Sequence, residues 1–235
     1  MDAPSVIRRR QGALLAIGLA PFVALGAGQC ARPSAPAAKW PPGTVLTLNG
    51  VPLTEAEIDQ IGSGFALLEP QDSILQLRRL ALSTVIFPGI AARDIDPNRR
   101  EEALRMARAW KHDLESGTLP SGPLSGPMEV ETRGTFPDLG FEVWRAALDA
   151  EPGRWSEVIE SPGAFHLMRV KKREEGALPA LVRFTIGAFH FPYLDPPTGR
   201  AAIEAALDRS HLTLLDESWR EAVPPAWLYR LHANP

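Results

Sequence analysis

The chain has 235 residues, of which 45% are hydrophobic, so it is long and apolar enough for one or two small domains with cores of their own. Its formal net charge is −3 at pH 7 and it has no basic cluster beyond the N-terminus, which argues against nucleic-acid binding. A single cysteine, Cys30, excludes an intrachain disulfide. The 23 prolines and 19 glycines predict many turns.

The first 29 residues have the order of a secretory signal peptide. Arg8, Arg9 and Arg10 precede an apolar stretch over residues 13–27, and small residues follow it. A buried N-terminal helix is the alternative, but the order of charged, apolar and small residues favours the signal. The apolar stretch is short for a transmembrane helix. We therefore predict a signal peptide at 1–29.

Cys30 is followed by ARPSAPAAK, which predicts an irregular Pro/Ala-rich tether over residues 30–42. Signal, cysteine and tether together resemble the start of a bacterial lipoprotein. That resemblance implies a lipidated Cys30 and attachment to a membrane. A plain secreted protein with an incidental cysteine is the alternative. Under either interpretation the protein is extracytoplasmic, in the periplasm or cell envelope.

Residues 45–53 alternate in the manner of a small hairpin, with Asn49-Gly50 as its turn. Thr54 and Glu57 have the spacing of a capping box, and Leu53 with Ile58 can form a hydrophobic staple, so a helix is predicted from Thr54.

Residues 73–87 place apolar side chains on one helical face, with Pro88 as the predicted end of the helix. A strand over STVIF is the alternative for its last part. Asp96-Pro97 begins a further predicted helix, which runs to about Ser116 and ends at Gly117. Residues 118–127 are predicted as a loop.

The stretch 133–173 reads as a turn, a short helix and two strands. Asp138 is predicted to cap the helix, whose apolar stripe includes Trp144 and Leu148. Strands are predicted over residues 155–159 and 165–170, with Pro162-Gly163 as the tight turn between them. We expect Trp144 and Leu148 to be buried beneath the sheet that contains residues 165–170.

A strand is predicted over residues 182–191, a helix over 201–209 and a short strand over 211–215, followed by a Trp-rich end. The fold class is therefore α+β, with an N-terminal helical segment and a small antiparallel sheet flanked by helices. After the signal and the tether, the predicted regions are residues 43–117, 118–175 and 176–235.

Two phrases in this order resemble the C-terminal half of a parvulin domain, the small peptidyl-prolyl cis-trans isomerase module. They are residues 152–159 (PGRWSEVI) and 163–170 (GAFHLMRV), preceded by Arg133-Gly134 before a helix. Residues 48–59 (LNGVPLTEAEID) resemble the opening of SurA-like periplasmic chaperones. The resemblance implies an isomerase or folding chaperone for exported, proline-containing polypeptides, with no cofactor. A fold of this kind that has lost catalysis and only binds extended chains is the alternative.

In the parvulin family, two sheet histidines and a nearby Asp or Cys form a hydrogen-bond network below a proline site lined by Met and Phe. The resemblance places His166 at the second histidine and implies Met168, Phe136 and Phe165 as substrate-binding residues. A core histidine satisfied within the sheet is the other interpretation of His166.

Two family positions are not matched directly. The acid falls on Pro127, and Glu129 or Glu131 could replace it only with a change of register. The first histidine would fall near Thr84, if that segment were a strand.

His190 offers a replacement for the missing first histidine. Residues 188–193 (AFHFPY) resemble the family's first histidine strand, which in an ordinary parvulin pairs with the last strand. A reversal centred near Leu178 would set His190 opposite His166 in an antiparallel pair, on the same face. We predict this permuted arrangement of the catalytic pair His166 and His190. The alternative is an added edge strand on which His190 faces solvent.

The remaining chemistry is sparse. Five scattered histidines and one cysteine do not give the spacing of a zinc site, so no metal is predicted. There is no Walker loop and no G-x-S-x-G motif.

Overall fold

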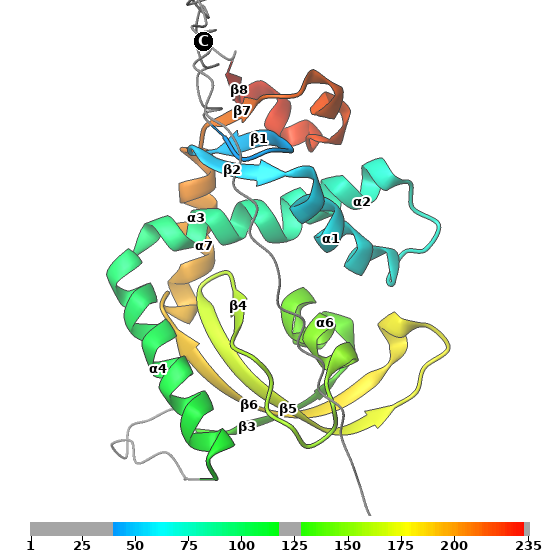
Figure 1. The fold of residues 1–235 in the computed structure, drawn as a ribbon, viewed down its shortest axis with the longest axis vertical. Coiled ribbons are helices and arrows are strands. Elements are labelled where there is room, and N and C mark those ends of the chain that lie inside the picture. The colour runs from blue at the N-terminus through cyan, green and yellow to red at the C-terminus, as the bar shows by residue number, and fades with distance from the viewer. Residues whose placement is uncertain (1–39, 118–127, 233–235) are drawn as a thin grey trace, which may run out of the picture. The chain divides into compact units, whose positions relative to one another are not determined.

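The computed structural model describes residues 40–117 and 128–232, all within one compact unit, Ala38–Pro235. These residues form two four-stranded sheets with helices around them (Figure 1). The predicted α+β class is confirmed. The predictions for the signal peptide at 1–29, for Cys30 and for the loop at 118–127 lie outside the described residues.

The first sheet has the strand order β2-β1-β7-β8 and joins the two ends of the described chain. Its strands are β1 (Thr44–Leu48), β2 (Val51–Thr54), β7 (Leu212–Leu214) and β8 (Leu231–His232). The hairpin of β1 and β2 is confirmed, and its turn has φ 52° at Asn49 and φ 78° at Gly50. These positive φ angles are those of the two-residue hairpin turn that Asn-Gly favours. Because β1 also pairs with β7, residues 43–117 and 176–235 build this sheet together.

The helices after the hairpin begin with the predicted capping box. The Glu57 carboxylate accepts from the Thr54 backbone N–H at 2.9 Å, and helix α1 runs over Glu55–Ala66. A second capping box, from Ser73 to Gln76, begins α2 (Ile74–Leu80). The chain then continues without a break through a π-helical turn, η1 (Ala81–Ile86), into α3 (Phe87–Ile95).

The prediction that a helix ends at Pro88 is therefore wrong, and so is the strand alternative. Just before Pro88, the Phe87 N–H bonds to the Leu82 carbonyl, five residues back. Proline lacks an N–H and crowds the carbonyl four residues before it. Pro88 lies where the wider π-helical turn gives way to the ordinary helix, so the missing donor costs little and the helix continues.

The helical stretch Ile74–Ile95 is long and apolar enough to cross a membrane by length and composition alone, and 33% of its most apolar window is buried. It is the one such helix among the described residues. Phe87, Leu82 and Ile90 from this stretch belong to the hydrophobic core. A core helix of a soluble domain passes the same test.

Helix α4 (Pro97–Glu115) follows at once and agrees with the prediction. The Asp96 carboxylate caps it by accepting from the Arg99 backbone N–H at 3.0 Å, and Gly117 follows its end with φ 73°.

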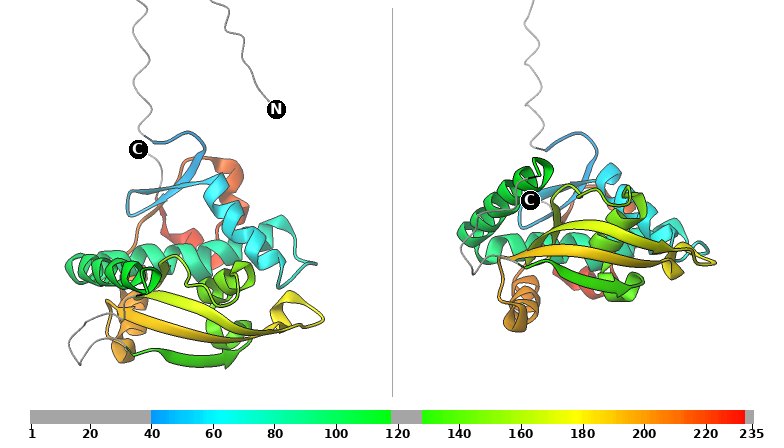
Figure 2. Two further views of the ribbon diagram at one scale, coloured as in Figure 1. Left: turned by 60° about the horizontal axis from the view of Figure 1, so that its bottom comes forward. Right: turned by 90° about the horizontal axis from the view of Figure 1, so that it is seen from below.

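The second sheet is entirely antiparallel, with the order β3-β6-β5-β4. Its strands are β3 (Val130–Gly134), β4 (Ile159–Ser161), β5 (Ala164–Glu174) and β6 (Arg183–Pro192). Figure 2 shows β3, β5 and β6 as neighbouring, twisted strands. The turn at Pro162-Gly163 is confirmed, with φ 98° at Gly163. The strand predicted over 155–159 is largely wrong, because Trp155 makes one isolated bridge and β4 begins only at Ile159.

Two helices link β3 to β4, and Asp138 has a different role from the one predicted. It lies inside α5 (Phe136–Leu139), where its carboxylate accepts from the Thr135 backbone N–H at 2.9 Å. Gly140, with φ 75°, then separates α5 from α6 (Phe141–Asp149). Asp138 thus helps to cap a short helix that precedes the predicted one.

The C-terminal part continues with η2 (Pro179–Leu181), β6 and α7 (Pro196–Asp208). Helix α7 begins earlier than predicted because Pro196 and Pro197 take the first helical positions, where their missing N–H groups have no intrahelical partner to lose. The Trp-rich end forms two short 3₁₀ helices, η3 (Glu217–Ala222) and η4 (Pro225–Arg230).

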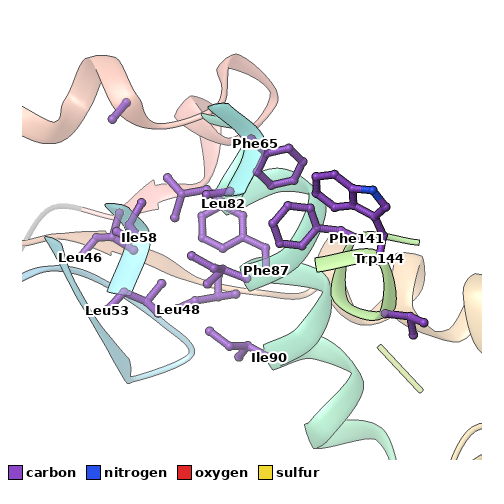
Figure 3. Packing of buried hydrophobic residues seen from close by; sticks show 14 of the residues in the cluster. Leu46, Leu48, Leu53, Ile58, Phe65, Leu82, Phe87, Ile90, Phe141 and Trp144 are labelled. Carbon is purple, nitrogen blue, oxygen red and sulfur yellow. The ribbon is translucent and has the colours of Figure 1, made fainter. Parts of the chain in front are cut away.

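The core has two clusters, one on each face of the second sheet. The larger joins the hairpin, α1, α3 and α6 to one face, and Figure 3 shows Phe65, Phe141 and Trp144 packed within it. Trp144 is fully buried, as predicted, whereas Leu148 is only half-buried at the edge of this cluster. The smaller cluster packs α4 against the other face.

Candidate functional site

His166 and His190 lie directly opposite each other on the antiparallel strands β5 and β6. Their Nδ1 atoms are 2.7 Å apart and their ring planes meet at 83°. This pairing confirms the predicted register and the shared face. Strand β6 lies between β3 and β5, so the alternative of an added edge strand is wrong. His190 is exposed but its ring is held by His166.

Ser161 extends this pair into a chain of three polar side chains. Its Oγ lies 2.6 Å from His166 Nε2. Ser161 is the last residue of β4, across from Ala164, which makes it a diagonal neighbour of His166 on the same face. The sequence contained this signal, because a hairpin centred on Pro162-Gly163 brings the serine next to the histidine strand. Ser161 is not among the site residues predicted from the sequence.

Hydrogen-bond geometry links the two contacts. In the Nδ1–Nδ1 contact one ring must donate and the other accept, so the accepting ring is neutral and the two rings are not both protonated. With both rings neutral, a His166 ring that donates there accepts at Nε2 from the Ser161 hydroxyl. If His166 accepts from His190, its Nε2–H donates to Ser161 Oγ. The donor direction at one end of the chain therefore fixes the direction at the other.

The environment favours these neutral rings. Burial, with a contribution from the charge of His190, lowers the pKa of His166 to about 4. Partial burial of its ring also lowers the pKa of His190. These shifts favour the neutral form of both rings near neutral pH, and two neutral rings can make both short contacts.

A cleft of about 500 Å³ adjoins this chain, and Ser161 forms part of its wall. The other walls come from β2, α1, η1, α3 and α6. They include Ile61, Ile86, Ile90, Phe141 and Glu142. The cleft thus combines apolar side chains with the hydroxyl that contacts the histidine pair. A space of this size with a few polar groups is typical of small-ligand or peptide sites.

The substrate-binding residues implied by the resemblance do not gather at this cleft. Met168 shares the histidine face but is fully buried in the core. Phe165 lies on the opposite face, because side chains alternate along β5, and it packs in the cluster beneath α4. Phe136 is half-buried and contacts Trp144 edge-to-face, with ring centroids 5.3 Å apart. Met168 and Phe165 are therefore corrected to core residues.

No acid joins the histidines through the positions considered from sequence. Glu129 pairs with Arg169 and Lys171, and Glu131 pairs with Lys171. The Glu129 carboxylate reaches Lys171 by crossing Gly187, where a Cβ would collide with it. Thr84 lies in the π-helical turn rather than in a strand. Pro127 is outside the described residues.

Within residues 40–117 and 128–232, no group of three or more His, Cys, Asp or Glu side chains is placed to hold a metal ion. The chemistry available at the site is hydrogen bonding by Ser161 and the two histidines, beside an apolar cleft.

Comparisons with known proteins give no family assignment. No protein-family model matches the sequence, and no curated protein and no solved structure matches the chain.

Proposed function

We propose that this protein is an extracytoplasmic peptidyl-prolyl cis-trans isomerase that assists the folding of exported polypeptides. One observation carries the proposal: the chain Ser161–His166–His190 joins a pair of sheet histidines to a hydroxyl in the wall of a cleft. The parvulin resemblance implies such a pair with an Asp or Cys. Here the third member is a serine.

The reaction makes modest chemical demands that this site can meet. Rotation about a peptide C–N bond has a barrier of about 18–20 kcal/mol, because the planar amide is stabilised by resonance. A site that removes water from the amide and binds its twisted form better than its planar form lowers this barrier. The apolar walls at Ile61, Ile86 and Ile90 supply the dry surface for a proline ring. Ser161, held by His166, supplies a fixed hydrogen-bonding group.

A second candidate is a binding module that holds extended chains without catalysis. It is favoured by the burial of Met168 and by the position of Phe165 on the far face, because the Met/Phe-lined proline site of the resemblance is not formed next to the histidines. The cleft would then bind a peptide segment while the histidine chain served only to fix the strands.

A protease-coupled isomerisation assay on Xaa-Pro tetrapeptides separates the two candidates. The isomerase should accelerate the cis-to-trans step, and His166→Ala and His190→Ala should each reduce kcat/KM by about tenfold or more, as expected for the loss of about 1.4 kcal/mol of transition-state stabilisation. The double variant should lose less than the product of the two, because both histidines belong to one chain.

His112→Ala is the matched control, since His112 lies on α4 away from the histidine face. Binding of the peptides without any acceleration would reject the isomerase and favour the binding module. Additive effects of the two histidine variants would argue against a shared site.

We also propose that the mature protein is attached to a membrane through a lipidated Cys30. The support is the order of residues 1–30 alone. Cys30→Ala should move the protein from the membrane fraction to the soluble fraction after cell lysis. An unchanged distribution would favour the plain secreted form.

A further inference from the structure

The charged side chains around the cleft differ in whether they already have partners. Glu57 accepts from the Thr54 backbone and hydroxyl. Arg93 and Glu160 pair with each other at 2.9 Å. Arg145 pairs with Asp149 at 2.7 Å. Among the described residues Glu142 alone of the charged groups lining the cleft has no oppositely charged or hydrogen-bonding side chain as partner.

The position of Glu142 is fixed by packing. It is the second residue of α6, directly after Phe141, whose ring stacks on Phe65 with centroids 4.2 Å apart. The α1 backbone approaches this ring at Gly64, where an added Cβ would lie 2.7 Å from Phe141. Helix α6 therefore cannot shift away easily, and the Glu142 carboxylate stays at the cleft wall.

This environment makes a carboxylate without a charged partner costly, and in the described part of the chain Glu142 has only a hydrogen bond from its own backbone N–H. Burial raises the pKa of Glu142, which means that water solvates its charged form poorly. A positive group delivered into the cleft would offset that cost, whereas a second negative group would add repulsion. A metal ion is a poor candidate, because a divalent cation needs several oxygen ligands and the cleft, among the described residues, offers one carboxylate without a side-chain partner.

The remaining wall favours the aliphatic part of a peptide. Ile61, Ile86 and Ile90 are apolar, and Ser161 places the end of the histidine chain at the same cleft. A lysine or arginine side chain suits both features, because its stem packs on apolar surface while its charged head remains available to an acid. A proline beside it would occupy the rest of the apolar surface.

We propose that the cleft binds extended Xaa-Pro segments in which the residue immediately before the proline is lysine or arginine, with its charged head at Glu142. This inference rests on the proposed function, since it names the substrate class for the same cleft. It applies to the isomerase and to the binding module alike, because it concerns recognition of the segment.

The test compares three fluorescein-labelled tetrapeptides that differ only in lysine, norleucine or glutamate before the proline. Fluorescence anisotropy measures their binding, and exchange NMR measures isomerisation of the same peptides. We expect the lysine peptide to bind about tenfold more tightly than the norleucine peptide, and the glutamate peptide to bind weakest. The preference should shrink as salt is added.

Glu142→Gln keeps the shape of the side chain and should reduce the lysine preference to about that for norleucine. Glu142→Lys should reverse the order and favour the glutamate peptide, which guards against a loss caused by misfolding. Glu102→Gln is the matched control, because Glu102 is exposed on α4 and does not line the cleft. It should leave the preference unchanged.

The outcomes for binding and for catalysis are distinct. Equal binding of the lysine and norleucine peptides, or a preference that survives in Glu142→Gln, would overturn the inference while measured isomerisation would still support the isomerase. A lysine preference that depends on Glu142 without any isomerisation would support the inference and reject the isomerase.

Discussion

The two faces of the β3-β6-β5-β4 sheet use alternate residues of the same strands and have different contents. On one face Phe165, Leu167 and Phe189 pack under α4 against the small side chains of Ala103 and Ala107. On the other face the apolar residues Met168 and Ile186 give way to the histidine pair at one end of the strands. The first face is apolar under α4 and charged farther along β5, where Arg169 pairs with Glu129. The second face is apolar in its middle and polar beside the cleft.

This difference follows from what covers each face. The alanines of α4 let the helix backbone approach closely over Phe165, Leu167 and Phe189, so apolar side chains fill the space beneath the helix. On the other face the cover is divided between α6 and the helices that line the cleft. Polar side chains are tolerated there because His166 and His190 satisfy each other and Ser161 completes the chain. Period-two alternation decides the face on which each residue lies, and the helices that cover that face decide whether the residue belongs to the core or to the site.

Trp144→Ala should have the largest effect on stability, a loss of about 3–5 kcal/mol in the free energy of unfolding, because the side chain is fully buried in the larger cluster. Urea unfolding followed by circular dichroism measures it. Tyr229→Ala is the control, since this side chain is 74% exposed and should change stability by less than about 0.5 kcal/mol. A loss under about 1 kcal/mol for Trp144→Ala would contradict its place in the core.

Phe165→Ala tests the correction of a predicted substrate-binding residue. We expect a similar stability loss of about 3–5 kcal/mol, because Phe165 is 2% exposed beneath α4. Peptide affinity measured per folded molecule, well below the new melting temperature, should be unchanged. A variant that folds normally but has lost peptide binding would place Phe165 in the substrate site after all.

Much of the fold could be predicted from local signals. The Asn49-Gly50 turn, the Thr54 capping box and the Asp96 cap depend on residues that are adjacent in sequence, and the structure has them where local rules put them. The features that could not be predicted depend on parts of the chain beyond the local residues. The helix passes Pro88 because a π-helical turn precedes it, and no local rule for proline contains that information. The pairing of β1 with β7 spans most of the chain, so local patterns could not predict it.

The site was predictable in part for the same reason. Alternation and a reversal near Leu178 were sufficient to set His166 opposite His190, and η2 lies at that reversal. Alternation also places Phe165 on the far face, yet the family resemblance had assigned it to the substrate site. The cleft could not be predicted, because its walls come from elements that are distant in sequence. Glu142 itself resembles any acid in the first turn of a helix.

The stability of the protein should fall in acid, because burial holds His166 in its neutral form. An unfolded histidine titrates near pH 6.5, whereas the pKa of His166 in the folded protein is about 4. Between these values the unfolded chain binds a proton that the folded protein does not, so stability is full above about pH 6.5 and decreases as the pH falls toward 4. The shift corresponds to a loss on the order of 3 kcal/mol.

Urea unfolding between pH 4 and pH 7.5 measures this dependence. Carboxylates also titrate near the lower limit, so the informative quantity is the difference from His166→Gln, which should have a flatter profile between pH 4 and 6.5. Parallel profiles for the two proteins would mean that His166 is not held neutral by the fold.

The smallest expected effect is a coupling between Ser161 and His190, which are each bonded to His166. A single neutral hydrogen bond contributes about 0.5–1.5 kcal/mol, so Ser161→Ala and His190→Ala should each cost about that much. Their effects should not add, because the donor direction at His166 Nδ1 fixes the direction at His166 Nε2. Once either end is removed, His166 is free to choose the orientation that suits the other end. We therefore expect a coupling of about 0.5 kcal/mol or more in a double-mutant cycle measured by urea unfolding at pH 7.5.

Ser156 provides the control, because its hydroxyl accepts from the Met168 backbone N–H and shares no hydrogen bond with the histidines. The cycle of Ser156→Ala with His190→Ala should be additive within about 0.3 kcal/mol. Equal coupling in both cycles would show that the strands transmit it, and that Ser161, His166 and His190 do not act as one chain.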